Sequence, residues 1–416
     1  MHVLMALWDG GGTVPVELGI GRRLVEAGHR VTALAEPSIE AGVTAAGARF
    51  EPWRTAPQFA QAEIADWECR TPVSLFGRLL GRLVTGPSAR YAADVRAVAA
   101  GESFDAAVVD FVLMGALAAT ESLRIPTAAT MPNVYVRPTP GEPPFGLGLV
   151  PGTGPLTRLR DQLLPRVMHR AWDLGRKQLN ATRRDLGLPP LVHVWDQLDR
   201  AERVLVLTAE AFDFPPARRP DNVAYVGPVL DDPEWAGAVE PPEGEEPLVL
   251  VATSTGRTRG SDRLVRNVVE ALAGLPVRAV VTTGPAVEPV PAPRPGIHVV
   301  PAAPHAQLLP HADVVVTHGG HGTVVKALAA GRPCLVMPLG RDQPDNAARV
   351  VRHHAGLSLR SSAEPDRIAA ALTRLLEDRS FATSAAELGR RIRAEVDDRR
   401  IVGAVESLSA PRSSRT

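Results

Sequence analysis

Short apolar runs alternate along the chain with longer stretches in which apolar residues recur every three or four positions. Residues 3–7 and 30–34 are apolar runs, and residues 17–27 between them have helical spacing that ends before Gly28. A buried parallel strand is a short, nearly continuous apolar run, and the helix that follows it is amphipathic. The chain therefore opens with a predicted βαβ unit. Repeats of this unit predict an α/β protein.

The repeating pattern is interrupted at residues 226–247. Prolines and acidic residues replace the apolar periodicity there, which is typical of a boundary between domains. A new apolar run begins at residue 248 and leads into a helical pattern. We predict a first Rossmann-like domain at 1–228, a linker at 229–247 and a second Rossmann-like domain at 248–390.

The most informative stretch covers residues 313–347. It predicts a strand at residues 314–316, a glycine-rich turn at 318–323, a helix at 324–330 and a second strand at 334–337. A polar loop that holds Asp342, Gln343 and Asn346 follows, and a further helical stretch covers residues 346–354. The turn reads His-Gly-Gly-His-Gly-Thr, and its glycines let the backbone approach a bulky ligand. The helix behind it offers unpaired N–H groups and the positive end of a dipole. These features favour a phosphate ligand.

Side chains around the turn are consistent with a sugar phosphate. Thr323 adds a hydroxyl, and His318 can donate to an anionic oxygen. Asp342 and Gln343 follow the next strand, where α/β sheets bind their ligands, and their side chains suit sugar hydroxyls. The alternative is a tight turn between strand and helix that binds nothing.

With these residues in view, the chain resembles the Leloir glycosyltransferases of the GT-B fold, in particular actinobacterial enzymes that glycosylate natural products. The resemblance implies two Rossmann-like domains facing across a cleft, with the acceptor bound by the first. Residues 391–408 would form a helix that returns to the first domain, and the Pro- and Gly-rich residues 132–155 an acceptor-side loop. For the donor diphosphate, the resemblance implies His318, Gly319, Gly320, Gly322, Thr323, Ser254 and Thr255. For the donor sugar it implies Asp342 and Gln343, and for the nucleobase Ala303 and His305.

Two positions depart from the family pattern. Lys326 stands where many members carry a Glu that in some of them binds the donor ribose. Thr13 stands where the catalytic base usually lies, and a Thr hydroxyl cannot accept a proton at neutral pH. Three alternatives remain for catalysis: Asp9 in the same loop reaches the acceptor, Asp110 acts directly, or the acceptor is a phenol or aromatic carbon that needs little help. Asp110 can equally be an ordinary helix cap.

Composition excludes several other classes of protein. The 416 residues carry no net charge, which gives no basic surface for nucleic acid, and the two cysteines give neither a disulfide framework nor a zinc set. Gly10, Gly11 and Gly12 lack the spacing of a dinucleotide fingerprint. No apolar run approaches a membrane span or a signal peptide. We expect a cytoplasmic monomer or homodimer without a metal or other cofactor.

The resulting hypothesis is glycosyl transfer, with inversion, from a nucleotide diphosphate sugar to a small, largely apolar natural product. Kinship favours a thymidine diphosphate (TDP) deoxysugar as donor, with uridine diphosphate (UDP) sugars as the alternative. A sugar-nucleotide epimerase of the same fold would share the donor loops. A non-catalytic binder of a sugar nucleotide or natural product would explain Thr13.

Overall fold

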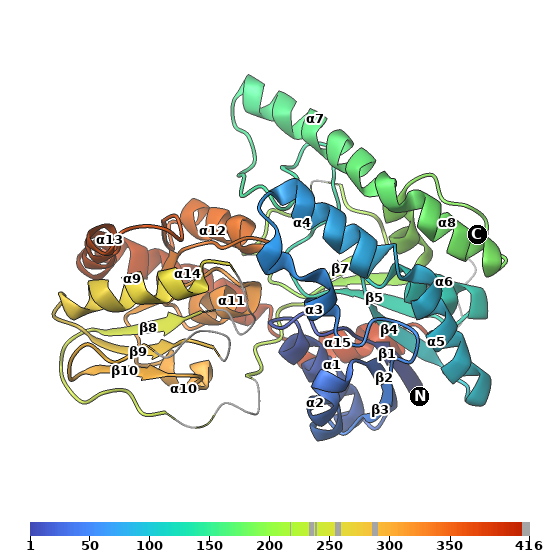
Figure 1. Ribbon diagram of the computed structural model, residues 1–416, viewed down its shortest axis with the longest axis horizontal. Helices are drawn as coiled ribbons and strands as arrows, with labels where there is room; N and C mark the ends of the chain where they lie inside the picture. The colour runs from blue at the N-terminus through green and yellow to red at the C-terminus, as the bar shows by residue number, and fades with distance from the viewer. Residues whose placement is uncertain (217, 233–236, 238, 254–258, 285–289, 410–416) are drawn as a thin grey trace.

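The protein consists of two parallel β-sheets with helices on both faces of each, as the computed structural model in Figure 1 shows. The structure describes residues 1–216, 218–232, 237, 239–253, 259–284 and 290–409. All structural statements below concern these residues.

The first sheet is parallel throughout, in the order β3-β2-β1-β4-β5-β6-β7. Its strands are β1 (His2–Ala6), β2 (Arg30–Ala35), β3 (Arg49–Pro52), β4 (Ala106–Asp110), β5 (Thr127–Met131), β6 (Arg203–Val206) and β7 (Val223–Tyr225). Neighbouring residues of β1 enter the cores on opposite faces, Leu4 on one side and Val3 and Met5 on the other. Two buried faces explain why the strands are continuous apolar runs.

Helices connect these strands across both faces. The α-helices are α1 (Val14–Glu26), α2 (Glu40–Ala45), α3 (Ala60–Ile64), α4 (Pro72–Leu79), α5 (Ser88–Gly101), α6 (Met114–Leu123), α7 (Pro155–Trp172) and α8 (Arg176–Asp185). Shorter helical segments are η1 (Pro37–Ile39), η2 (Asp66–Glu68), η3 (Leu80–Val84), η4 (Asp173–Gly175) and η5 (Val194–Arg200). In Figure 1, α7 runs along the top of the first domain, and α4 is drawn between α7 and the first sheet.

The second sheet has the order β10-β9-β8-β11-β12-β13 and is also parallel. Its strands are β8 (Leu248–Ala252), β9 (Arg278–Thr282), β10 (Ile297–Val300), β11 (Val314–Thr317), β12 (Cys334–Val336) and β13 (Gly356–Ser358). Its helices are α9 (Ser261–Ala273), α10 (His305–Leu308), α11 (His321–Ala329), α12 (Gln343–Arg352), α13 (Pro365–Glu377) and α14 (Arg379–Ala394).

The chain returns to the first domain through α15 (Asp398–Glu406). Ile401 and Val405 of α15 are buried in the same core as Ile20 of α1. By contrast, α14 packs against α11 of the second domain. The crossing therefore falls between α14 and α15, whereas the sequence placed the returning helix from residue 391, inside α14.

Three local expectations differ from the structure. The strand β3 was not predicted, because its four residues, Arg-Phe-Glu-Pro, do not form an apolar run and none of them is fully buried at the sheet edge. The helix α11 begins at His321 rather than at residue 324, so the second half of the glycine-rich turn is already helical. The helix α12 begins at Gln343 rather than at 346, so the expected polar loop is shorter.

Candidate active site

The turn between β11 and α11 is tight, and two of its glycines cannot be replaced without displacing a neighbour. Gly319 has φ 98°, and a Cβ atom there would lie 2.8 Å from Cγ1 of Val336. A Cβ on Gly320 would lie 2.7 Å from Nε2 of His318. The turn therefore brings the His318 ring over Gly320 at the start of α11, where the first N–H groups of a helix lack partners.

His318 is buried at this helix start, with 8% of its surface exposed. Its Nδ1 lies 3.5 Å from the carbonyl oxygen of Ala252, at the end of β8. A carbonyl can only accept, so Nδ1 carries the proton and Nε2 of the neutral ring is an acceptor. Burial lowers the pKa of His318. An anion arriving beside Nε2 would favour the doubly protonated ring.

Asp342 and Asn346 connect the turn to α12. Oδ2 of Asp342 accepts from the N–H of His321 over 3.2 Å and from Nδ2 of Asn346 over 2.8 Å. The same Nδ2 donates to the carbonyl of Gly319. The structure thus brings Asp342 to the start of α11, beside His321. Asn346 was noted in the sequence but given no role, and here it fixes the spacing of the two loops.

Other predicted donor residues are placed less directly. Oε1 of Gln343 accepts from the N–H groups of Leu339 and Gly340, so this side chain folds back onto its own loop. Thr323 lies in the first turn of α11. Ser254 and Thr255, predicted diphosphate contacts, lie outside the described residues.

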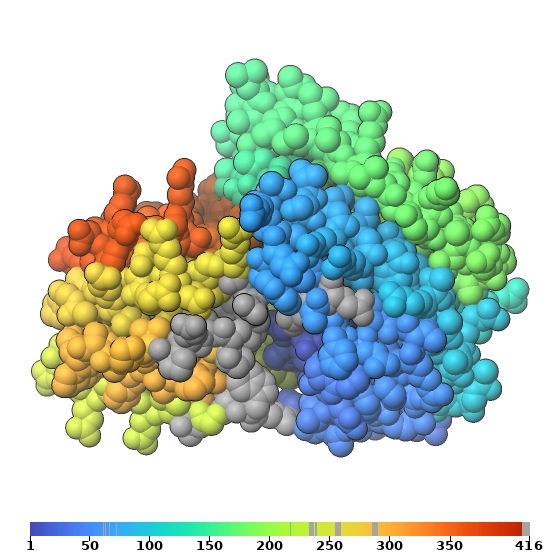
Figure 2. Space-filling model, in the orientation of Figure 1, coloured from blue at the N-terminus to red at the C-terminus, as the bar shows by residue number. Residues whose placement is uncertain are grey.

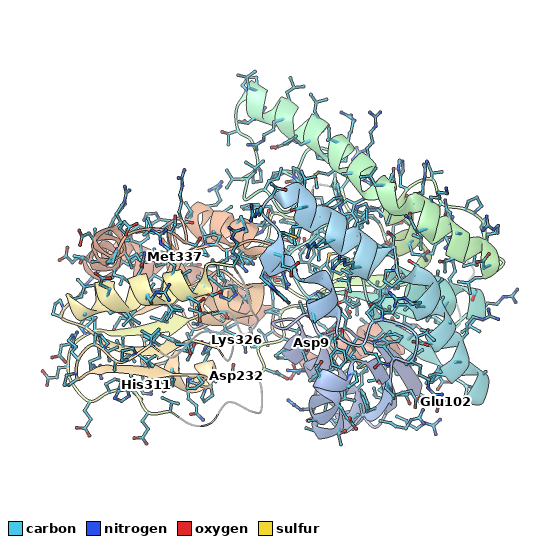
Figure 3. All side chains as sticks on the ribbon, in the orientation of Figure 1. Asp9, Glu102, Asp232, His311, Lys326 and Met337 are labelled. Atoms are coloured by element: carbon cyan, nitrogen blue, oxygen red, sulfur yellow. The ribbon has the colours of Figure 1, made fainter. Side chains whose placement is uncertain are left out.

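Lys326 forms an ion pair with the linker. Its Nζ lies 2.6 Å from Oδ1 of Asp232 and also donates to the carbonyl of Asp231. Oδ2 of Asp232 accepts from the N–H of Ala306, at the start of α10. Figure 3 shows this pair on the side of the second domain that faces Asp9. Sequence reasoning missed Asp232, although the two consecutive acids of the linker were a visible signal.

The predicted base-binding residues lie beside this pair. Ala303 is buried in the core of the second domain, and His305 is the first residue of α10. Burial lowers the pKa of His305 to about 4, so the ring is neutral at pH 7. Main-chain groups and a neutral imidazole can both form hydrogen bonds to a nucleobase.

The loop between β1 and α1 approaches the donor turn from the first domain. The carbonyl oxygen of Gly12 lies 3.8 Å from the place a Cβ would take on Gly322. In Figure 2 the surface is hollowed between the two domains, and residues near the N-terminus, in dark blue, appear deep in the hollow. The predicted catalytic loop and the predicted diphosphate turn therefore face each other.

Within this loop, both oxygens of the Asp9 carboxylate accept hydrogen bonds. Oδ1 accepts from the N–H of Gly11 over 3.0 Å, and Oδ2 accepts from the hydroxyl of Ser38 over 2.9 Å. The N–H of Asp9 in turn donates to the buried Glu36. This network holds the loop conformation.

Asp110 is 1% exposed and lies in a buried polar cluster. Its oxygens accept from Nε1 of Trp8 over 3.1 Å and from the N–H of Val112 over 2.9 Å. The carboxyl of Glu17 forms a hydrogen bond with it, and burial raises the pKa of Asp110 to about 6. Burial and the charge of Asp110 raise the pKa of Glu17 well above its usual value. Burial therefore favours the protonated form of both carboxyls.

Thr13 precedes α1 without capping it through its side chain. Its Oγ1 is buried and has no hydrogen-bond partner among the described residues. This atom lies 2.4 Å from the place a Cβ would take on Gly10. The hydroxyl thus fills space beside the loop.

Aromatic side chains of the first domain form a continuous group near Asp110. Phe76 of α4 meets Trp172 edge-on at 5.2 Å, Trp172 meets Trp195 at 4.8 Å, and Trp195 stacks on Phe111 at 6.3 Å. Phe76, Phe111 and Trp172 are only partly buried. An apolar wall of this kind suits an apolar ligand. Phe111 follows β4 directly, a position that could have marked it in the sequence.

The predicted acceptor-side loop is attached to the second domain. Oδ2 of Asp345, in the first turn of α12, accepts from the N–H of Gly146 over 2.7 Å. A Cβ on Gly148 would lie 2.8 Å from Cβ of Pro344. The acceptor-side loop therefore rests on the helix that Asp342 precedes.

Two searches of the described residues gave negative results. In the described part of the chain, no group of three or more His, Cys, Asp or Glu side chains could hold a metal ion. None of the described helices is long and apolar enough to cross a membrane.

The chain is similar to known proteins in sequence and in structure. Residues 266–408 match the family described as erythromycin biosynthesis protein CIII-like, C-terminal domain. The chain is 31% identical over 405 residues to 4'-demethylrebeccamycin synthase of Lentzea aerocolonigenes, covering 93% of this chain and 94% of that protein. The solved glycotransferase of kitacinnamycin has a TM-score of 0.79 at 24% identity, covering 98% and 99% of the two chains. The spinosyn rhamnosyltransferase SpnG complexed with thymidine diphosphate has a TM-score of 0.66 at 20% identity, covering 99% and 100%.

Proposed function

The chain belongs to the actinobacterial natural-product glycosyltransferases with the GT-B fold, and from this premise we propose its reaction. A sugar is transferred from a nucleotide diphosphate donor to a small, largely apolar natural product, with inversion at the anomeric carbon. The donor binds to the second domain and the acceptor to the first.

One observation carries the donor half of the proposal. The start of α11, the ring of His318 and the carboxylate of Asp342 meet at one point, opposite the loop at Gly12. Helix N–H groups and a positive dipole end bind a diphosphate, and a carboxylate accepts hydrogen bonds from sugar hydroxyls. These groups stabilise the negative charge that develops on the leaving diphosphate.

The proposed donor is a TDP-deoxysugar. A relative of the same fold, the spinosyn rhamnosyltransferase, is known in complex with thymidine diphosphate, and rhamnose is a deoxysugar. Lys326 adds support, because it is bound to Asp232 and cannot accept hydrogen bonds from a ribose. TDP carries a deoxyribose, which has one hydroxyl fewer to satisfy.

Inversion follows from the proposed placement of the two substrates. The acceptor approaches from the first domain, and the diphosphate leaves toward α11 on the opposite side. Attack from the face opposite the leaving group inverts the anomeric carbon in one displacement. The aromatic group of Phe76, Phe111 and Trp172 provides the apolar surface for the acceptor.

Calorimetric titration of the purified protein with TDP, UDP, guanosine diphosphate and NAD, without added metal, tests the donor site. We expect TDP to bind more tightly than the other three. Binding of NAD instead, or of none of the diphosphates up to millimolar concentration, would contradict the proposal. TDP binding without release of sugar from any TDP-sugar would indicate a non-catalytic binder.

A further inference from the structure

Whether a carboxylate at the loop between β1 and α1 can remove a proton from the acceptor decides which acceptors can react. We propose that the acceptor presents a phenolic hydroxyl, or an O–H or N–H of similar acidity, which loses its proton to water before transfer. This inference rests on the proposed function and names the acceptor class for the same site.

The first support comes from Asp9, the titratable side chain of the loop. Both of its oxygens accept hydrogen bonds, from Gly11 and from Ser38. Hydrogen bonds to a charged carboxylate are stronger than those to a neutral group, so a proton taken from an acceptor would weaken the contacts with Gly11 and Ser38 that hold the loop. Asp9 is therefore built to hold the loop.

The second support comes from Asp110, which is buried and already hydrogen-bonded. Trp8 and Val112 donate to it, and the carboxyl of Glu17 forms a hydrogen bond with it. A general base must come within about 3 Å of the proton that it removes. Asp110 is 1% exposed, so an acceptor cannot come this close to it unless the residues that bury it move.

The other side chains near the loop that could accept a proton have other roles. Glu36 is buried and accepts from the N–H groups of Asp9 and Ala60. His305 and His318 belong to the second domain, in the proposed nucleotide site. Thr13 has a hydroxyl that cannot accept a proton at neutral pH. Among the described residues of the loop between β1 and α1 and of its hydrogen-bond partners, no side chain is free to act as the base.

Without a base on the protein, transfer to an aliphatic alcohol is slowed far more than transfer to a phenol. A phenol with a pKa near 10, like tyrosine, is ionised to about 1% at pH 8. An alcohol as weakly acidic as water, with a pKa of about 15.7, is ionised to roughly one part in 10⁸. Phenols are also planar and apolar, and they suit the aromatic group of Phe76, Phe111 and Trp172.

The reaction balances without a protein base. The phenol first gives its proton to water or buffer. The phenolate oxygen then forms a bond to the anomeric carbon as the bond from that carbon to the diphosphate oxygen breaks. The electron pair of the broken bond stays with TDP, which leaves as an anion held at α11.

The experiment compares acceptors of one shape and different acidity, using the full-length protein with TDP-rhamnose and TDP-glucose. The panel pairs planar phenols with their hydroxymethyl analogues, such as 2-naphthol with 2-naphthylmethanol. A general base contributes about 10²–10⁴-fold, so we expect kcat/KM to be at least about 100-fold higher for the phenols. The pH at which the rate levels off should move to lower pH with 6-cyano-2-naphthol, which is more acidic.

Several outcomes would overturn the inference. Equal transfer to phenols and hydroxymethyl analogues would do so, as would no transfer to any phenol while TDP still binds. A pH profile that is the same for all acceptors would indicate a base on the protein. Asp9→Asn and Asp110→Asn identify such a base. Replacing the base would lower kcat/KM 100-fold or more, whereas we expect each variant to lower kcat/KM about threefold or less. Failure to bind TDP at all would instead remove the proposed function.

Discussion

Nη2 of Arg349 lies 2.6 Å from Oδ1 of Asp213, so a helix of the second domain and a loop of the first share a buried ion pair. Oδ2 of Asp213 also accepts from the N–H of Tyr135 and the hydroxyl of Tyr225. Tyr135 lies at the start of the acceptor-side loop, and Arg349 lies on α12, which Asp342 precedes. This pair therefore joins the proposed acceptor and donor sides.

Arg349→Met should destabilise the protein strongly. It leaves the Asp213 charge buried without its partner, and breaking a buried pair from one side typically costs about 3–5 kcal/mol. Urea unfolding at pH 7.5 measures the change in the free energy of unfolding. The matched control is Asp213→Asn combined with Arg349→Met, which removes both charges and should recover part of the loss. A double variant as unstable as the single one would show that the charge is not the cause.

Asp345 should make thermal stability depend on pH. Burial raises the pKa of Asp345 to about 7, well above its value of 3.8 in an unfolded chain. The folded state therefore binds more protons than the unfolded state between about pH 4 and 7, and stability falls as pH rises through this window. Burial also raises the pKa of Glu142, in the acceptor-side loop, to about 7, so it acts in the same direction.

Melting temperatures measured at pH 5 and pH 8 test this expectation. The wild-type protein should melt at a higher temperature at pH 5, and Asp345→Asn should narrow the difference, because its amide does not ionise. Asp378→Asn is the matched control, since this carboxyl is exposed and its pKa is lowered by Ser380. An unchanged pH difference in Asp345→Asn would contradict the assignment.

His318 should take up a proton when TDP binds. Its Nδ1 proton faces the Ala252 carbonyl, so Nε2 can donate to a phosphate only in the doubly protonated ring. TDP affinity should therefore rise as the pH falls from 8 to 6, and titrations in two buffers of different ionisation enthalpy should show proton uptake. His318→Ala should weaken TDP about 10- to 100-fold, as expected for a hydrogen bond to a charged group.

Gly320→Ala tests the same geometry without removing the imidazole. Its Cβ would lie 2.7 Å from Nε2 of His318, so the ring must move away from the helix start. We expect weaker TDP binding and less proton uptake. Gly403→Ala, on α15 where a Cβ meets nothing within 4 Å, is the control and should bind TDP as the wild type does. Wild-type behaviour of Gly320→Ala would remove His318 from the site.

The fold could be predicted because its signals are local. The continuous apolar strands and amphipathic helices predicted an α/β protein of two Rossmann-like domains, and this architecture is confirmed. The edge strand β3 was not predicted because it has no continuous apolar run. The starts of α11 and α12 were placed three residues late, since glycine, proline and polar residues in a first helical turn resemble a loop.

The residues predicted for donor binding and those predicted for catalysis differ in how far the sequence could place them. His318 and Asp342 could be brought together in advance because neighbouring parallel strands end at the same sheet edge. The partners of Asp110 could not be predicted. Trp8 and Glu17 are 102 and 93 positions away from it in the sequence, and no local pattern indicates their contact. Lys326 is a similar case, because its partner Asp232 lies in the linker.

Asp342→Ala should separate use of the sugar from binding of the nucleotide. If the carboxylate holds the donor sugar, its loss should lower kcat/KM for a TDP-sugar by about 100-fold. Oδ2 of Asp342 also accepts from the N–H of His321, so its removal frees a helix N–H and takes a negative charge away from the diphosphate. Free TDP should then bind at least as tightly as to the wild type. Calorimetry with TDP beside steady-state kinetics with TDP-rhamnose measures both effects. Asp342→Asn, which keeps a hydrogen-bond acceptor without the charge, should retain more activity than Asp342→Ala. A parallel loss of TDP affinity would show that Asp342 only maintains the turn.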